Sequence, residues 1–346
     1  MERIKKGILL LMLLAVVACN EEGNEPRPGP IAEPDPLIEI TFSPSPIDLE
    51  GIDAQFAQDL AYDQYEKTKF DVFLPNSASP TGMVIFIHGG GFTGGDKAFI
   101  YTEDYDETVR ELLRNNLAVA TLNYRLLGNN ETEGVLKSLH DSRRSLQYIR
   151  YIFQELNIDK EKIVLFGSSA GAGTSLWLAS HDDFKDEANT DPILRESTRV
   201  KGIALRGTQS SYDIEGRWFN DVFGEFGLSF EDYLVDFGEA SILQFYGLSS
   251  MDEYDTPEVE AYRQEVDMLA ALTADDPEIW VANSGPKNEA PQDQGDLNHH
   301  GFHAREIKEF ADAAGVANVA KYGKPTLFDN QNGESYTDFL IRKVNE

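Results

Sequence analysis

Ile163-Val164-Leu165-Phe166-Gly167-Ser168-Ser169-Ala170-Gly171 is the stretch that decides how this chain folds. Its first four residues are all apolar, and such a short run predicts a buried strand. The pattern G-x-S-x-G follows at once and leads into a helical pattern. Glycine lacks a Cβ atom, so the chain can turn sharply here and expose Ser169 at the tip of the turn. The segment therefore predicts a serine that is placed as a nucleophile.

Short apolar runs alternate with helical patterns on both sides of this segment, as in α/β proteins. Such alternation predicts a mostly parallel sheet of about eight strands with helices on both faces. The expected strands are Ile38–Phe42, Lys69–Leu74, Met83–His88, Ala118–Leu122, Ile163–Phe166, Val200–Leu205, Glu278–Ala282 and Val316–Lys321. The expected helices are Glu103–Arg114, Gly134–Leu156, Ser169–Ser180, Phe302–Ala314 and Tyr336–Val344.

The pattern changes at about residues 207–274, where aromatic residues are frequent and no strand is evident. We interpret this segment as a helical cap inserted over one end of the sheet. Most of its aromatic side chains are expected to form the small core of the insertion itself. A few could line a pocket for an apolar or aromatic group.

A second glycine-rich motif, His88-Gly89-Gly90-Gly91, directly follows the expected strand Met83–His88. Backbone N–H groups of such a loop can approach a ligand closely. Negative charge that develops on a carbonyl oxygen during acyl transfer is stabilised by two or three donors of this kind. Gly90 and Gly91, together with the N–H group of Ala170 after the nucleophile, are the expected donors.

The N-terminal region is expected to lie outside the folded domain. Positive residues precede an apolar run, Ile8–Ala18, which is too short to span a bilayer but suits the core of a signal peptide. Val16-Val17-Ala18-Cys19 resembles the lipobox of bacterial lipoproteins, in which the cysteine is lipidated. We therefore expect a signal peptide at 1–18, a flexible tether at 19–36, a domain at 37–346, and a lipid anchor that holds the chain in the bacterial cell envelope.

Composition limits the partners of the chain. Aspartate and glutamate number 60 against 30 lysines and arginines, and the formal net charge is -30. Nucleic acid is disfavoured because its binding depends on phosphate neutralisation by basic residues. Polyanionic substrates such as sulfated glycans are disfavoured for the same reason. Cys19 is the only cysteine, which excludes an intramolecular disulfide.

Taken together, the two glycine motifs resemble those of α/β-hydrolases of the carboxylesterase and lipase type. Local features agree with this resemblance: Asp71-Val72-Phe73-Leu74-Pro75, Asn123-Tyr124-Arg125, and Asp159-x-x-Lys162-Ile163. It covers roughly Phe70 to the C-terminus and is weakest in the insertion and the last thirty residues. It implies an α/β-hydrolase fold, no cofactor, and hydrolysis of a carboxylic ester through an acyl-serine intermediate on Ser169.

The resemblance implies an acid and a histidine after the serine, in that order. Asp293 and Asp296 lie in the region where the family has its acid, and the spacing favours Asp296. The family's histidine follows the last strand, yet no histidine occurs after His303. This chain therefore departs from the family at the position of the catalytic base.

Six histidines are available. His88 belongs to the glycine-rich loop, and His140 and His181 are expected to be packing or capping residues. The remaining candidates are His299, His300 and His303. In one hypothesis His300 or His299 is a relocated base, oriented by Asp296 or Asp293, because an imidazole titrates near neutral pH.

Two other hypotheses stay open for this histidine cluster. Without a base the domain would be a catalytically impaired hydrolase fold that acts as a binding module. Alternatively, the histidines with a nearby aspartate would bind a metal ion, although the ligand spacing is weak.

Two nucleotide-binding motifs fit less well. Gly89–Gly94 matches G-x-G-x-x-G, but the loop continues at Gly95 instead of opening a helix. Gly167–Gly173 lacks the Lys-Ser/Thr pair of a phosphate-binding loop.

An ester remains the expected substrate: a glycan-linked acetyl or feruloyl ester, a small acyl ester or a lipid-like ester.

Overall fold

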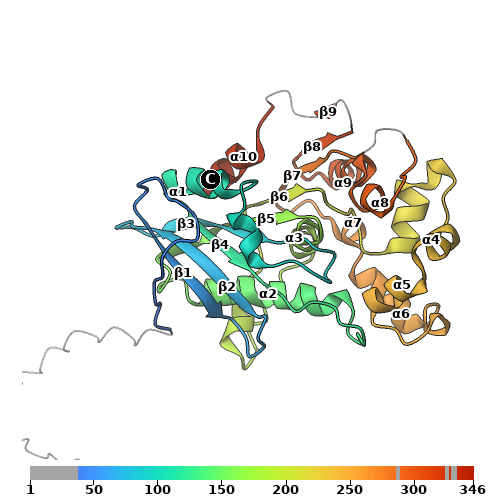
Figure 1. The fold of residues 1–346 in the computed structure, drawn as a ribbon, viewed down its shortest axis with the longest axis horizontal. Coiled ribbons are helices and arrows are strands. Elements are labelled where there is room, and N and C mark those ends of the chain that lie inside the picture. The colour runs from blue at the N-terminus through green and yellow to red at the C-terminus, as the bar shows by residue number, and fades with distance from the viewer. Residues whose placement is uncertain (1–37, 286–288, 324–326, 329–332) are drawn as a thin grey trace, which may run out of the picture. The chain divides into compact units, whose positions relative to one another are not determined.

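Nine strands form one sheet in the order β1-β2-β4-β3-β5-β6-β7-β8-β9. The computed structural model describes residues 38–285, 289–323, 327–328 and 333–346. Strands β4, β3, β5, β6, β7 and β8 are parallel neighbours, whereas β1, β2 and β9 pair in antiparallel fashion. The prediction of an α/β fold with a mostly parallel sheet is therefore confirmed, with one strand more than expected (Figure 1).

The strands are β1 (Ala54–Ala61), β2 (Lys69–Pro75), β3 (Thr81–Ile87), β4 (Ala118–Leu122), β5 (Ile158–Ser168), β6 (Gly202–Arg206), β7 (Glu278–Asn283), β8 (Asn318–Tyr322) and β9 (Leu327–Phe328). The main helices are α1 (Asp106–Arg114), α2 (Val135–Tyr151), α3 (Ala170–Ser180), α8 (Gln294–His299), α9 (Gly301–Ala314) and α10 (Tyr336–Asn345). The 3₁₀-helix η1 spans Lys97–Tyr101, and η2 spans Pro192–Arg195.

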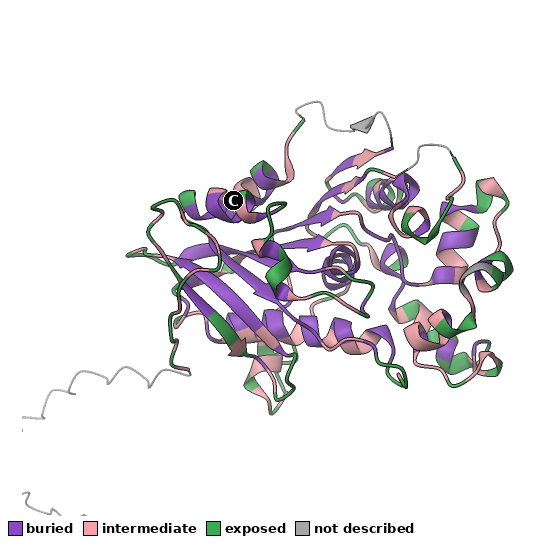
Figure 2. Ribbon diagram, in the orientation of Figure 1, coloured by how far each residue is buried: buried purple, intermediate pink, exposed green. Residues whose placement is uncertain are grey.

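Two hydrophobic cores lie on the two faces of the sheet, as alternation along the strands requires. In β3, Ile85 and Ile87 belong to one core, whereas Val84 and Phe86 belong to the other. Helices α2, α3 and α9 cover the first face, and α1 and α10 cover the second. The central strands are buried almost throughout, so both faces are closed to solvent (Figure 2).

The prediction of a first strand at Ile38–Phe42 was wrong. That run is largely exposed, and the edge strand β1 lies further along the chain at Ala54–Ala61. Its sequence, AQFAQDLA, has no β-branched residue and carries polar side chains at exposed positions. An edge strand needs only one buried face, which leaves a weak sequence pattern.

Helical elements occupy the region between β6 and β7, where a cap insertion at about 207–274 was expected. Tyr212, Trp218 and Phe223 are buried in the core that also contains α3 and α9, so this region packs against the rest of the domain. The elements are η3 (Ile214–Val222), η4 (Gly224–Phe226), α4 (Phe230–Phe237), α5 (Glu239–Tyr246), η5 (Met251–Glu253), α6 (Pro257–Glu265) and α7 (Met268–Ala271).

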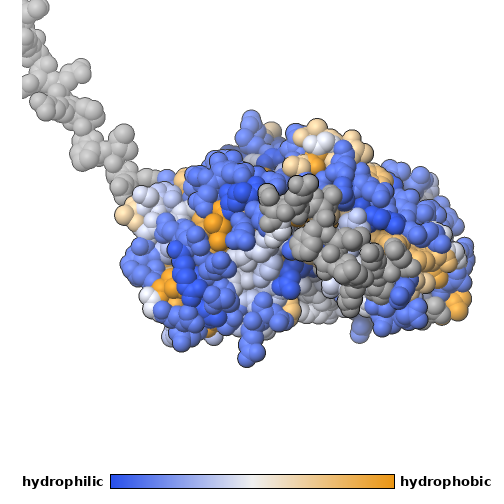
Figure 3. All heavy atoms as spheres, turned by 90° about the horizontal axis from the view of Figure 1, so that it is seen from above, coloured by the Kyte–Doolittle hydropathy of each residue, from blue (hydrophilic) through white to orange (hydrophobic). Residues whose placement is uncertain are grey.

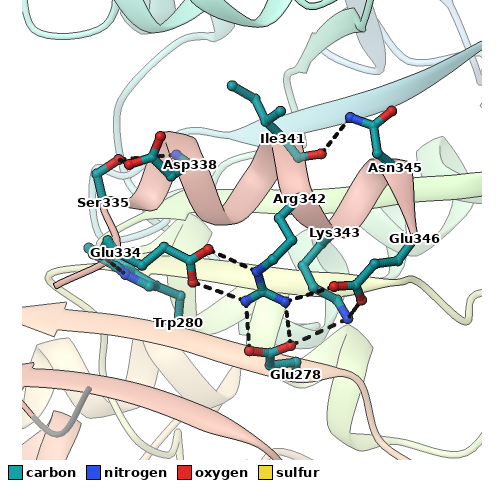
Figure 4. A network of polar contacts seen from close by, with 10 residues as sticks. All are labelled: Glu278, Trp280, Glu334, Ser335, Asp338, Ile341, Arg342, Lys343, Asn345 and Glu346. Atoms are coloured by element: carbon teal, nitrogen blue, oxygen red, sulfur yellow. Dashed lines mark hydrogen bonds and ion pairs between the residues drawn. The ribbon is translucent and has the colours of Figure 1, made fainter. Parts of the chain in front are cut away.

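A polar network fastens α10 to the beginning of β7. Arg342 donates to Glu278 and to Glu334, with N–O distances of 2.9 and 2.8 Å, and Lys343 lies 3.3 Å from Glu278 (Figure 4). The Trp280 indole N–H also donates to the Glu334 carbonyl oxygen, 3.0 Å away. These contacts fix the start of α10 and its first residue, Tyr336, against the sheet.

Hydrophilic residues dominate the face seen from above, with apolar residues scattered among them (Figure 3). None of the helices among the described residues is long and apolar enough to cross a membrane. The expected signal peptide at 1–18, the tether at 19–36 and Cys19 lie outside the described residues.

Candidate active site

Ser169 stands at the turn between β5 and α3. Its φ of 51° lies in the left-handed region that non-glycine residues rarely adopt. The two flanking glycines permit this turn. A Cβ atom at Gly167 would lie 2.2 Å from the Gly171 carbonyl oxygen, and one at Gly171 would lie 2.0 Å from the Ile87 carbonyl oxygen. Only glycine fits at either position, so the sequence motif and the strained serine are physically linked.

His299 contacts this serine. The distance from His299 Nε2 to Ser169 Oγ is 2.8 Å, within hydrogen-bond range. His299 is the last residue of α8, a six-residue helix in the connection between β7 and β8. One of the two histidines considered as a relocated base therefore lies where a general base must lie.

A backbone carbonyl holds the other side of the His299 ring. Burial lowers the pKa of His299 below 6.5, and hydrogen bonding to the Gly295 backbone opposes this shift without reversing it. A ring nitrogen that donates to this backbone carbonyl would leave Nε2 as the acceptor toward Ser169.

Asp296, predicted as the acid that orients the base, has a different role. Its backbone N–H is bound by the Asp293 carboxylate at 2.8 Å, and its own carboxylate accepts from the Gln292 N–H. Both aspartates therefore organise the first turn of α8. Among the described residues, the Gly295 backbone rather than a carboxylate is the group that favours the protonated form of His299 and works to raise its pKa.

Several contacts fix the position of α8. Asp293 caps its N-terminus, and Leu297 is buried in the core next to it. Gln209, which follows β6, donates to the Asn298 carbonyl oxygen at 2.8 Å. The histidine thus stands on a short but well-anchored helix at the carboxyl end of the sheet.

The prediction that named His300 together with His299 as the relocated base does not fit the structure for His300. His300 is fully buried; its Nδ1 accepts from the Phe302 N–H as the N-cap of α9, and its Nε2 lies 2.9 Å from the Glu289 carbonyl oxygen. His303 is also fully buried, and its two nitrogens contact Ser210 and the Leu297 carbonyl. Both rings are occupied by structural hydrogen bonds.

The expected oxyanion loop lies beside Ser169. Gly90 and Gly91 have φ values of 112° and 59°, and a Cβ atom at Gly90 would lie 2.3 Å from the Gly94 carbonyl oxygen. Phe92 anchors the loop because its ring is 1% exposed and packs against Tyr212 at a centroid distance of 5.3 Å.

Ala170 completes the expected set of donors. It is the first residue of α3, so its N–H group has no acceptor within the helix. The positive end of the helix dipole lies at the same place and favours negative charge there.

The remaining histidines have packing or capping contacts. His88 stacks on Tyr124 at a centroid distance of 4.4 Å. His181 ends α3, where its Nδ1 lies 2.8 Å from the Trp177 carbonyl oxygen. His140 packs against the Trp177 ring, and burial lowers its pKa to about 4.

A cavity of ≈ 540 Å³ opens over Ser169 and His299, and Gly90, Gly91 and Ala170 form part of its wall. Its volume lies in the range of small-molecule sites, about 300–1,000 Å³. The opposite wall comes from the region between β6 and β7 and includes the aromatic residues Tyr212, Trp218, Tyr233 and Phe245.

The structure also bears on two other interpretations of the sequence, a metal site and a dinucleotide-binding site. Within the described residues, no group of three or more His, Cys, Asp or Glu is arranged to hold a metal ion. The Gly89–Gly94 loop leads into a short 3₁₀-helix at Lys97–Tyr101, not into the long helix of a dinucleotide site.

The chain is similar in sequence and in fold to known proteins. Residues 70–208 match the BD-FAE family model, a span that includes the oxyanion loop and Ser169. The chain is carboxylesterase-like and has the α/β-hydrolase fold. The match ends before α8, so it does not include His299.

Individual proteins show the same likeness. A truncated form of a carbohydrate esterase from gut microbiota is similar with a TM-score of 0.61 and 17% identity, over 86% of this chain and 99% of that one. An acetyl ester-xyloside bifunctional hydrolase from Caldicellulosiruptor lactoaceticus is similar with a TM-score of 0.50 and 18% identity, over 77% and 75%.

In sequence, a secreted lipase from Arthroderma benhamiae is 29% identical over 150 residues, which make up 37% of this chain and 30% of the lipase. This carboxylesterase-like chain thus aligns with less than a third of that relative's length.

Proposed function

We propose that the chain hydrolyses a carboxylic ester through an acyl-serine intermediate. The observation that carries the proposal is the 2.8 Å contact between Ser169 Oγ and His299 Nε2 beside the oxyanion loop. A nucleophile, a base and backbone donors around one cavity are the parts that acyl transfer needs.

In this mechanism His299 accepts the Ser169 hydroxyl proton as Oγ forms a bond to the ester carbonyl carbon. The N–H groups of Gly90, Gly91 and Ala170 stabilise the oxyanion. The bond to the alcohol oxygen breaks, and the alcohol leaves with the proton from His299. Water then attacks the acyl-serine with His299 as base, which releases the carboxylic acid and restores Ser169.

Among the described residues, the Gly295 backbone rather than a carboxylate favours the imidazolium that forms in each step. A neutral dipole stabilises a cation less than a full charge does, so the barrier is expected to be higher than with a complete triad. The backbone contact still helps to orient the ring, and the contribution of orientation to the rate depends on geometry rather than on charge.

A glycan-linked acetyl or feruloyl ester is the substrate class we favour. The structurally similar proteins named as a carbohydrate esterase and an acetyl ester-xyloside hydrolase support this choice. The aromatic wall of the cavity, with Trp218 and Phe245, suits an apolar acyl group or a sugar face. A small acyl ester and a lipid-like ester remain the competing substrates.

The decisive experiment compares hydrolysis of 4-nitrophenyl acetate by the native chain, Ser169→Ala and Ser168→Ala. We expect Ser169→Ala to reduce kcat at least about 10³-fold, since the nucleophile is lost. Ser168→Ala is the matched control, a hydroxyl removed one residue earlier, and should retain activity. Equal activity of the native chain and Ser169→Ala would sink the proposal.

A catalytically impaired fold that acts as a binding module is the alternative, because the C-terminal histidine expected from the resemblance is absent. The position of His299 favours the enzyme, since it supplies the missing base from another element. If the native chain hydrolyses none of a series of acetyl, butyryl and feruloyl esters yet binds them, the alternative holds.

We further propose that the chain is attached to the bacterial cell envelope by a lipid on Cys19. The lipobox-like Val16-Val17-Ala18-Cys19 after an apolar run supports this proposal. Metabolic labelling with a radioactive fatty acid should label the native chain and leave Cys19→Ser unlabelled. Equal labelling of both would contradict it.

A further inference from the structure

A second cavity, of ≈ 590 Å³, adjoins Ser169 and His299 and has no role in the proposed mechanism. It lies at the carboxyl ends of strands β5 to β8, where α/β proteins bind ligands. Residues from these strands line it together with Tyr105, which precedes α1, and Tyr336, which begins α10. The wall opposite the strands therefore comes from elements outside the cap.

The charge of this cavity differs from that of the chain. Acidic residues outnumber basic ones two to one, at 60 to 30. Yet the described lining residues include Arg206 and Lys321 and no aspartate or glutamate. A described lining that contains Arg206 but no carboxylate is suited to an anionic group on a ligand.

Arg206 is held in place by aromatic rings. Its guanidinium lies between two aromatic rings, 4.9 Å from the centroid of Tyr105 and 5.1 Å from that of Tyr336. Across the described part of the chain it has no ion pair, unlike the arginines 110, 125, 217, 263 and 342, each of which contacts a carboxylate. The cation is thus preorganised and available to a ligand.

The surroundings of Arg206 are also rigid. Tyr336 is the first residue of α10, which Arg342 and Lys343 fasten to Glu278. The Arg206 carbonyl accepts from the Ser169 N–H at 2.9 Å, so the strand that carries the cation is bonded to the nucleophile turn. A group bound at Arg206 would therefore have a fixed position relative to the reacting serine.

We propose that this second cavity binds a carboxylate carried on a ring, with Arg206 as its anion-binding residue. One planar guanidinium matches the two oxygens of a carboxylate. The aromatic side chains in the lining, among them Tyr105 and Tyr336, favour a ring next to that carboxylate. An acidic sugar and an aromatic acid both carry this chemistry. If the cavity binds part of the ester substrate, the inference rests on the proposed ester hydrolysis. Binding of a carboxylate ligand as such does not depend on that proposal.

Calorimetric titration tests the site without turnover. Full-length Ser169→Ala protein is titrated with glucuronate and with benzoate, and with their neutral counterparts glucose and benzyl alcohol. We expect at least one acid to bind about tenfold or more tightly than its counterpart, since hydrogen bonds to a charged group are the strong ones. The acid that binds more tightly shows whether the cavity takes an acidic sugar or an aromatic acid. If neither acid is preferred, the inference is wrong, whatever the esterase assay gives.

Two further variants, made in the same Ser169→Ala background, locate the binding. Arg206→Gln should remove the preference for the acid, whereas Arg206→Lys should retain part of it because the charge remains but the planar fork is lost. Arg195→Gln, at an exposed arginine remote from the cavity, is the matched control and should bind as Ser169→Ala alone. An acid preference that survives in a folded Arg206→Gln protein would overturn the assignment.

Discussion

His299 Nε2 lies 2.8 Å from Ser169 Oγ, although 130 residues separate the two in the chain. The serine is presented by the turn after β5, and the histidine by the last residue of α8. The contact therefore depends on two elements that are each fixed independently, one by glycine packing and the other by a capped short helix.

Replacement of His299 tests this relationship. We expect His299→Gln to reduce kcat for 4-nitrophenyl acetate by about 10²–10⁴-fold, the usual contribution of a general base. His140→Gln, which also removes an imidazole but from the remote helix α2, should stay within about twofold of the native rate. A His299→Gln enzyme as active as the native one would show that another group takes the proton.

The pH dependence of catalysis follows from the environment of His299. Only the neutral imidazole can accept the serine proton, so activity falls as the ring becomes protonated. Burial lowers the pKa of His299 below its ordinary value of 6.5. The acid limb of the kcat/KM profile should therefore have its midpoint below pH 6.5, as measured from pH 4 to 9. A midpoint above 6.5 would require a carboxylate partner.

Local signals predicted the turn at Ser169 and the glycine-rich loop beside it because both depend on glycines at fixed spacing. At Gly167 and Gly171, any Cβ atom would collide with backbone, so the sequence carries the geometry directly. Strands β3 and β4 were predicted within two residues for a similar reason, since their apolar runs are buried on both faces.

The base was not resolved by the same reasoning. His299 and His300 are adjacent, and successive residues on a helix point about 100° apart. Which ring faces Ser169 depends on where α8 ends, and this helix of six residues has only one buried apolar residue, Leu297. Asp293 is a residue type that favours the N-cap position, and it stands three positions before Asp296. It could have indicated where α8 begins.

The acid supplies a third prediction. Asp296→Asn should leave kcat within about twofold, because the Asp296 carboxylate contacts the Gln292 N–H rather than the His299 imidazole. Asp293→Ala removes the cap of α8, which typically costs about 1 kcal/mol, and should lower kcat severalfold by loosening His299. Steady-state kinetics of both variants decide the matter. A hundredfold loss in Asp296→Asn would restore Asp296 as the orienting acid.

Buried histidines make the fold sensitive to acid. Burial lowers the pKa of His303 to about 3, so the folded state binds its proton less readily than the unfolded chain, where the pKa is near 6.5. The uncharged, buried His303 ring makes its full contribution to the free energy of unfolding above pH 6.5. This contribution is lost progressively as the pH falls toward 3. Between pH 6.5 and 5 this amounts to about 2 kcal/mol.

Urea unfolding at several pH values measures this loss. His303→Gln removes the titrating ring, so its stability should decline less between pH 6.5 and 5 than that of the native chain, even if it is less stable at pH 7. Parallel declines in the two proteins would mean that other groups cause the acid sensitivity.

A buried ion pair behind the oxyanion loop gives the last prediction. Lys97 Nζ lies 2.9 Å from Asp71 Oδ2 and 3.0 Å from Asp59 Oδ1, and the Asp71 side chain is 3% exposed. Lys97→Met leaves the Asp71 carboxylate buried without its cation, which should lower the free energy of unfolding by about 3 kcal/mol. The exposed Lys67, 3.6 Å from Asp96, is the matched control, and Lys67→Met should cost at most about 0.5 kcal/mol. Urea denaturation of both variants measures their free energies of unfolding. Equal small decreases in the two variants would mean that the loop is held by its backbone hydrogen bonds and by Phe92 alone.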